Sequence, residues 1–120
     1  MNEVLATVDL EMEENFAIVK CKATVIEVSD HDFNWGKDID SVVQRLEGRA
    51  LIISFSKVVI LSSAALQHLI QLYFRAKEQH IKFGLCGMNS GMAETFKITR
   101  LDTLFLIADT IDELKTLLGK

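Results

Sequence analysis

A short apolar run at residues 50–55 limits the fold of this chain more than any other feature. It contains Leu51, Ile52, Ile53 and Phe55, with a single serine among them. A nearly continuous apolar run of this length is typical of a central strand that is covered on both faces. An amphipathic stretch with apolar residues at helical spacing follows at residues 62–78. The sequence therefore predicts a buried strand followed by a helix that packs beside it.

Strands and amphipathic helices alternate along the rest of the chain. A period of two marks residues 16–23 and, more weakly, residues 4–12, which predicts a hairpin. A polar loop is expected over residues 28–37. Further strands are expected at residues 50–55, 82–86 and 104–107, and helices at residues 39–46, 62–78, from 89 onward and 110–118. This order predicts an α/β fold with a mostly parallel central sheet, an N-terminal antiparallel hairpin and about four helices.

The helical spacing also predicts which side chains face the core. In the helix over residues 62–78, the inward residues are expected to be Leu66, Leu69, Ile70, Tyr73 and Ala76. Thr110 and Glu113 have the spacing of a capping box at the start of the last helix. The inward residues of that helix are expected to be Ile111, Leu114, Leu117 and Leu118.

Length and charge restrict the class of protein. The chain has 120 residues, which suits a single domain spanning residues 1–120. Its formal net charge of −4 repels phosphate backbones and anionic lipids, so neither nucleic acid nor a membrane is an expected partner. No stretch approaches the ~20 apolar residues of a membrane span, and the acidic N-terminal region lacks the pattern of a secretory signal. We therefore expect a cytoplasmic protein.

The sequence gives no sign of a metal site or a cofactor. His31, His68 and His80 lie on different elements and outside any ligand spacing, so we expect exposed histidines. Cys21 and Cys86 are far apart and outside a Cys-x-x-Cys pattern, which predicts two buried, reduced thiols. No metal and no cofactor is expected.

Asp30, Asp32 and Asn34 stand at alternate positions, as the first ligands of a calcium-binding loop do. The rest of that pattern is absent, because Trp35 occupies the glycine position and Ser41 the position of the bidentate glutamate. A solvated loop is therefore expected. The chain also lacks a Gly-x-Ser-x-Gly elbow, and no serine has an evident base. We assign no catalytic residue and do not expect an enzyme.

Two consecutive serines, Ser62 and Ser63, stand at the start of the predicted helix over residues 62–78. A serine there accepts a backbone N–H bond, so helix capping alone accounts for one of them. A hydroxyl at a helix N-terminus is also a favourable phosphate site, because the dipole and the free N–H groups stabilise the added charge. The residues by themselves leave both interpretations open.

Two segments of the chain form a recognisable signature. Residues 54–66 read Ser-Phe-Ser-Lys-Val-Val-Ile-Leu-Ser-Ser-Ala-Ala-Leu, and residues 87–89 read Gly-Met-Asn. Residues 96–105 read Phe-Lys-Ile-Thr-Arg-Leu-Asp-Thr-Leu-Phe. Together they resemble the STAS domain, the bacterial anti-sigma factor antagonist family. The corresponding family motifs, in the same order, are Asp-Leu-Ser-Gly-Val-x-x-Ile-Asp-Ser-Ser-Gly-Leu, Gly-Leu-Asn-Pro and Leu-Thr-Gly-Leu-Asp-x-Leu-Phe. The resemblance is good over residues 51–118.

The resemblance implies a STAS-like domain that acts as a regulatory module. In this family, a serine at the start of the second helix is phosphorylated by a partner kinase that is also an anti-sigma factor, and Ser63 aligns with it. The unphosphorylated member binds the kinase and releases its sigma factor, whereas the phosphorylated member lets go, a cycle called partner switching. The residues expected to meet the partner around Ser63 are Asp30, Ser62, Ala64, Met88 and Asn89.

Departures from the family pattern support a second hypothesis. Ser62 stands where the family has Asp, while Ala64 and Ala65 replace its second serine and its glycine. The domain would then be a constitutive scaffold or a homodimerisation module in which Ser63 only caps its helix, and Phe74 would contribute to the interface. An enzyme or a small-ligand binder stays open as a third class, because ligand pockets need not show in a sequence.

Overall fold

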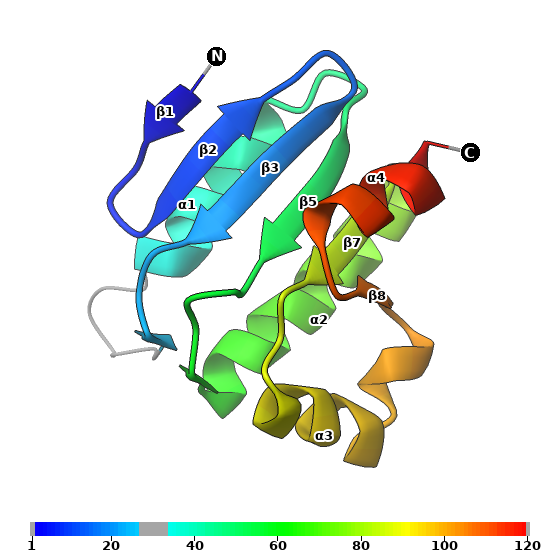
Figure 1. The fold of residues 1–120 in the computed structure, drawn as a ribbon. Helices are drawn as coiled ribbons and strands as arrows, with labels where there is room; N and C mark the ends of the chain where they lie inside the picture. The colour runs from blue at the N-terminus through cyan, green and yellow to red at the C-terminus, as the bar shows by residue number, and fades with distance from the viewer. Residues whose placement is uncertain (1, 27–33, 120) are drawn as a thin grey trace.

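Strand β5 (Ala50–Ser54) is the central strand that the apolar run predicts, and all of its residues are buried. The computed structural model describes residues 2–26 and 34–119. In it, β5 lies between β3 (Phe16–Cys21) and β7 (Phe83–Cys86), and both neighbours run parallel to it. Figure 1 shows helices on both faces of this part of the sheet. The burial of β5 follows from that double cover.

The main sheet has six strands in the order β1-β2-β3-β5-β7-β8. The edge strands are β1 (Asn2–Val4) and β8 (Leu106–Ala108), and β2 (Val8–Met12) pairs antiparallel with both β1 and β3. The predicted hairpin is therefore present as β2 and β3. The strand expected over residues 4–12 is two strands, because the chain turns at Thr7, whose N–H and hydroxyl donate to Asp38 Oδ2 at 2.8 and 2.7 Å.

The helices form two layers and one separate group. Figure 1 shows α1 (Asn34–Gln44) and α2 (Ser63–Glu78) on one face of the sheet and α4 (Ile111–Leu118) on the other. Helix α3 (Ser90–Ile98) and the short 3₁₀ helix η1 (Leu101–Thr103) lie between β7 and β8 in the chain. A separate two-stranded piece pairs β4 (Val25–Ile26) in parallel with β6 (Ile60–Leu61). The α/β fold with a mostly parallel sheet and four α-helices is confirmed.

The inward faces of two helices differ from the prediction. The buried residues of α2 are Ala65, Leu69, Leu72 and Ala76. Leu66, Ile70 and Tyr73 are only half-buried, because this flank of α2 turns toward the neighbouring α3–η1 group, where the Tyr73 and Phe105 rings lie 5.5 Å apart. In α4 only Leu114 and Leu118 are buried, and Leu117 is exposed. A short helix that packs on one side buries a narrower stripe than its apolar residues suggest.

Helix α1 begins at Asn34, earlier than the apolar spacing predicts. The loop expected over residues 28–37 therefore ends inside a helix, and Asp30 and Asp32 of the rejected calcium pattern lie outside the described residues. The reason is Trp35, which is 4% exposed and whose Nε1 donates to Cys21 Sγ at 3.3 Å. Anchoring this large ring in the core brings the chain into the helix one turn early.

The histidine prediction is wrong for His68 and right for His80. The His68 side chain is 15% exposed, and its Nε2 lies 3.4 Å from Asp40 Oδ1. Its ring also meets the edge of the Trp35 ring, with centroids 6.0 Å apart. His80 is exposed, whereas His31 lies outside the described residues. His68 therefore helps to join α2 to α1.

Cys21 and Cys86 are buried and free, as predicted. Burial raises the pKa of Cys21 to about 12. Burial also raises the pKa of Cys86, against a hydrogen bond with Ser54 that lowers it. Because the thiolate is the reactive form, neither thiol is a nucleophile near neutral pH.

Within residues 2–26 and 34–119, no group of three or more His, Cys, Asp or Glu side chains is arranged to hold a metal ion. No helix in the same part of the chain is long and apolar enough to cross a membrane.

Candidate functional site

The two serines at the start of α2 have different roles. Ser62 is the N-cap, with φ −68° and ψ 160°, and its Oγ accepts the N–H of Ala65 at 3.1 Å. Ser63 is the first residue of the helix and is exposed. Among the described residues, no hydrogen bond engages its hydroxyl. The hypothesis that Ser63 caps α2 is therefore wrong, and its hydroxyl is accessible from solvent.

The start of α2 is suited to carry negative charge on Ser63. The first N–H groups of an α-helix have no intrahelical partner, and those of Ser63 and Ala64 come before the one that Ser62 satisfies. The helix dipole places partial positive charge at the same point. The first turn of α2 contains no acidic residue, and Ala64 is exposed and small. A phosphate on Ser63 would therefore meet a favourable field without a repelling carboxylate in that turn.

Residues 58–63 lead into α2, and we call them the β6 segment. Their backbone is fixed to β4 and to the residue before it. The N–H of Val59 donates to Thr24 O at 2.6 Å, and the N–H of Ser62 donates to Ile26 O at 2.8 Å. The position of the α2 start thus depends on this short strand pair as well as on the helix itself.

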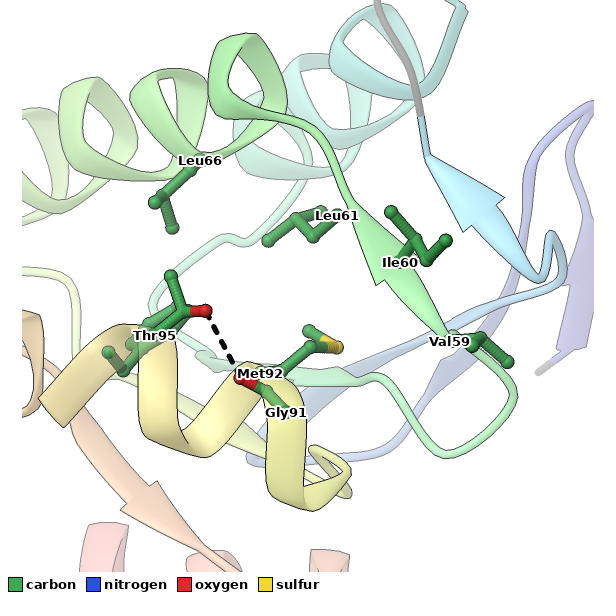
Figure 2. Close-up of a pocket in the computed structure, with 8 residues that line it drawn as sticks. Val59, Ile60, Leu61, Leu66, Gly91, Met92 and Thr95 are labelled. Carbon is green, nitrogen blue, oxygen red and sulfur yellow. Dashed lines mark hydrogen bonds between the residues drawn. The ribbon is translucent and has the colours of Figure 1, made fainter. Parts of the chain in front are cut away.

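An apolar pocket of about 220 Å³ opens between the β6 segment and α3. Figure 2 shows the β6 segment, with Val59, Ile60 and Leu61, on one side of it and α3, with Gly91, Met92 and Thr95, on the other. Val59 and Ile60 are 59% and 56% exposed. Exposed apolar side chains beside a pocket are typical of surfaces that bind other proteins.

Asn89 connects the two sides of this pocket. It is the N-cap of α3, where its Oδ1 accepts the N–H of Met92 at 2.8 Å. Its Nδ2 donates to the carbonyl oxygens of Val59 at 2.9 Å and Val58 at 3.4 Å. One side chain therefore caps α3 and holds the β6 segment beside it.

The residues expected to meet a partner lie in different places. Ser62, Ser63 and Ala64 are consecutive at the start of α2, whereas Asn89 contacts the other end of the β6 segment, at Val58 and Val59. Met88 is half-buried and lines a different hollow, of about 450 Å³, together with α3 and β8. Asp30 lies outside the described residues.

Val59, Ile60 and Thr95 are parts of this surface that were not predicted from the sequence. A signal was available for the first two, since they are β-branched apolar residues only a few positions before the paired serines. No comparable signal marks Thr95, whose hydroxyl donates to Gly91 O at 3.1 Å within α3 (Figure 2).

Several solved structures of anti-sigma factor antagonists have a fold similar to that of this chain. The first, from Mycobacterium paratuberculosis, has a TM-score of 0.80 and 22% identity, covering 95% of this chain and 94% of that chain. The second, an anti-sigma-factor antagonist (STAS) domain protein from Planctomyces limnophilus, has a TM-score of 0.81 and 18% identity, covering 96% and 100%. The anti-sigma factor antagonist SpoIIAA in its unphosphorylated form has a TM-score of 0.68 and 12% identity, covering 94% and 97%.

No curated protein matches the sequence. The sequence model of the STAS domain family, in contrast, matches residues 7–114. That range runs from the turn before β2 into α4 and includes both the β6 segment and the start of α3. With the match covering most of the chain and the fold in agreement, the chain belongs to the STAS domain family.

Proposed function

We propose that this protein is a cytoplasmic regulatory module that binds a protein partner through the surface around Ser63 and releases it when Ser63 is phosphorylated. This is the role of an anti-sigma factor antagonist that acts by partner switching. The proposed partner is an anti-sigma factor that is also a serine kinase. The observation that carries the proposal is the exposed Ser63 hydroxyl at the start of α2, which follows the exposed residues Val59 and Ile60 in the chain.

The energies of burial explain how one phosphate would reverse binding. Full burial of an apolar side chain such as Val59 or Ile60 contributes about 1.5–3 kcal/mol. A phosphoserine carries a charge of about −1.5 to −2, and each buried, unpaired charge costs several kcal/mol. A phosphate on Ser63 is solvated and stabilised by the start of α2 in the free protein, so removing its solvent at a partner interface carries a cost that opposes the gain from the apolar contacts. Phosphorylation would release the partner without any change in the fold.

The module has a regulatory and not a catalytic role in this proposal. The buried thiols are protonated near neutral pH, and the proposed modification is made by the partner. SpoIIAA is a fold relative described in its unphosphorylated form, which supports a phosphorylation cycle here. No cofactor is needed for binding and release.

The first test is to recover tagged protein from its native cells. We expect phosphate on Ser63 by intact mass and peptide mapping, together with a co-purifying protein that has a serine-kinase domain. Unmodified protein in a stable assembly without a kinase would contradict the proposal and support the scaffold hypothesis.

Substitution of Ser63 tests the switch with the recovered partner. Ser63→Ala should bind as the unmodified protein does, and Ser63→Glu should bind at least tenfold more weakly, since its carboxylate brings charge into the interface. Thr116→Ala and Thr116→Glu are the matched controls, because Thr116 is an exposed hydroxyl residue of α4, on the opposite face of the sheet from α2. Equal affinities for the Ser63 variants would exclude the switch.

The apolar part of the surface is tested separately. Ile60→Ser should weaken partner binding by about tenfold, the effect of removing roughly 1.5 kcal/mol of apolar contact. Ile98→Ser removes an isoleucine that is 73% exposed at the far end of α3 and should leave the affinity unchanged. An affinity that responds equally to both variants would place the partner elsewhere.

A further inference from the structure

We propose that Asn89 is a positioning residue, which holds the β6 segment against α3 and thereby sets the geometry in which Ser63 meets its partner. The effect of Asn89 on partner binding rests on the proposed function. Its effect on the β6 segment can be tested on the free protein. The role of Asn89 thereby changes from the expected direct contact with the partner to control of the surface that makes the contact.

The hydrogen bonds of Val59 show why Asn89 has this effect. The Val59 N–H donates to Thr24 O at 2.6 Å, while its carbonyl oxygen accepts Asn89 Nδ2 at 2.9 Å. The backbone of Val59 is therefore held from two sides, by the residue before β4 and by the N-cap of α3. Its side chain stays 59% exposed, so the backbone is fixed while the side chain remains available to a partner.

The position of the pocket gives this link a functional consequence. The 220 Å³ pocket lies between α3 and the β6 segment, and Asn89 joins these two sides. Loss of the link would let the sides separate and would shift Val59 and Ile60 relative to the start of α2. Because an interface needs close shape complementarity at its apolar centre, such a shift weakens binding even when every contacting side chain is present.

A second contact at the same junction shows that the two loops are built to lie close together. Gly87, two residues before Asn89, has φ +76°, and a Cβ placed on it would lie 2.9 Å from the backbone nitrogen of Ser56. The N–H of Phe55 donates to Cys86 O at 2.9 Å. These contacts bring the loop after β7 against the loop after β5, and Asn89 extends the junction to the β6 segment.

The capping and positioning roles of Asn89 can be separated by substitution. Asp and Ser are both good N-cap residues, so Asn89→Asp and Asn89→Ser keep an acceptor for the N–H of Met92. Both remove the amide donor that reaches the carbonyls of Val58 and Val59. Asp adds a negative charge and Ser does not, so agreement between the two variants excludes a charge effect.

Amide hydrogen exchange on the free protein is the first measurement. In both variants the amides of Val59 and Ile60, which donate to Thr24 O, should exchange about tenfold faster. The amides of Met92 and Ala93, which report the cap of α3, should keep their rates. Asn15→Asp makes the same chemical change in the exposed turn between β2 and β3 and should leave both sets unchanged. Unchanged exchange at Val59 and Ile60 would overturn the proposal.

The second measurement uses the recovered partner. Asn89→Asp and Asn89→Ser should each lower partner affinity and the rate of Ser63 phosphorylation by about tenfold, while both variants stay folded under the conditions of the binding assay. Faster exchange with unchanged affinity would overturn the positioning role. Weaker binding by Asp alone would overturn it too, because that result shows a charge effect. If no partner is recovered, the proposed function fails, while the exchange experiment still decides whether Asn89 holds the β6 segment.

Discussion

Helices α2 and α3 begin in the same way but present different surroundings. Each has a polar N-cap, Ser62 or Asn89, followed by an exposed serine, Ser63 or Ser90. Val59 and Ile60, which precede α2, are exposed, whereas Gly87, which precedes α3, is half-buried and packs against the loop after β5. Both helix starts border the apolar pocket. An exposed serine at a helix start therefore does not by itself mark a regulatory site, and the STAS motif over residues 54–66 is what singles out Ser63 as the candidate.

The two N-cap side chains also differ in how far along the chain their hydrogen-bond partners lie. The Ser62 hydroxyl serves its own helix, and the Asn89 amide serves its own helix and also a segment 30 residues away in the chain. A short side chain is sufficient where backbone hydrogen bonds already place the helix start, as those to β4 do for α2. A longer amide is needed where the cap must also join two loops. Substitutions at both helix starts can test this difference.

The largest expected effect is at Gly87. Gly87→Ala should lower the free energy of unfolding by about 3 kcal/mol, because φ +76° strains an L residue and the new Cβ meets the Ser56 backbone at 2.9 Å. Urea unfolding followed by circular dichroism measures it. Gly91→Ala is the control, since its Cβ would meet only Asn89 Oδ1, at 3.5 Å. A similar loss in both variants would show that the close approach at Gly87 is unimportant.

The second-largest expected effect is the difference in stability lost when the N-cap of α2 or the N-cap of α3 is removed. Ser62→Ala should cost about 1 kcal/mol for the lost cap. Asn89→Ala should cost about 2 kcal/mol, because it also leaves the carbonyls of Val58 and Val59 without their donor. Urea unfolding of both variants under identical conditions gives the comparison. Equal costs would mean that the reach of Asn89 to the β6 segment contributes no stability.

The smallest effect is expected at the two exposed serines. Ser63→Ala and Ser90→Ala should each change the free energy of unfolding by no more than about 0.5 kcal/mol, because neither residue is the cap of its helix. The same unfolding measurement applies. A loss near 1 kcal/mol for Ser63→Ala would show that Ser63 contributes to capping, and the division of roles between Ser62 and Ser63 would have to be revised.

Features that depend on neighbouring residues were predictable from the sequence. The buried run at β5, the helical spacing of α2 and the capping residues Thr110 and Asn89 are all local patterns. The STAS motif at residues 54–66 added the family and drew attention to Ser63. Periodicity and capping are set within one or two turns of chain, so one sequence is sufficient to read them.

Features that depend on contacts between distant segments were not predictable in this way. The apolar spacing misplaced the start of α1, because the hydrogen bond from Trp35 to Cys21 cannot be read from periodicity. It also misjudged which flank of α2 is buried, because the neighbouring α3–η1 group decides that. In both cases a partner on another element changed the local preference.

The sequence alone determined that the chain alternates strands and helices, that β5 is buried and that a serine stands at the start of α2. Only the tertiary structure decided that Ser62 caps the helix and Ser63 stays exposed, and that Asn89 reaches Val59 across 30 residues of chain. The physical reason is the distance along the chain over which each kind of interaction acts. Helical and strand preferences arise from near neighbours, whereas exposure and hydrogen bonds between loops exist only once the folded chain has brought the segments together.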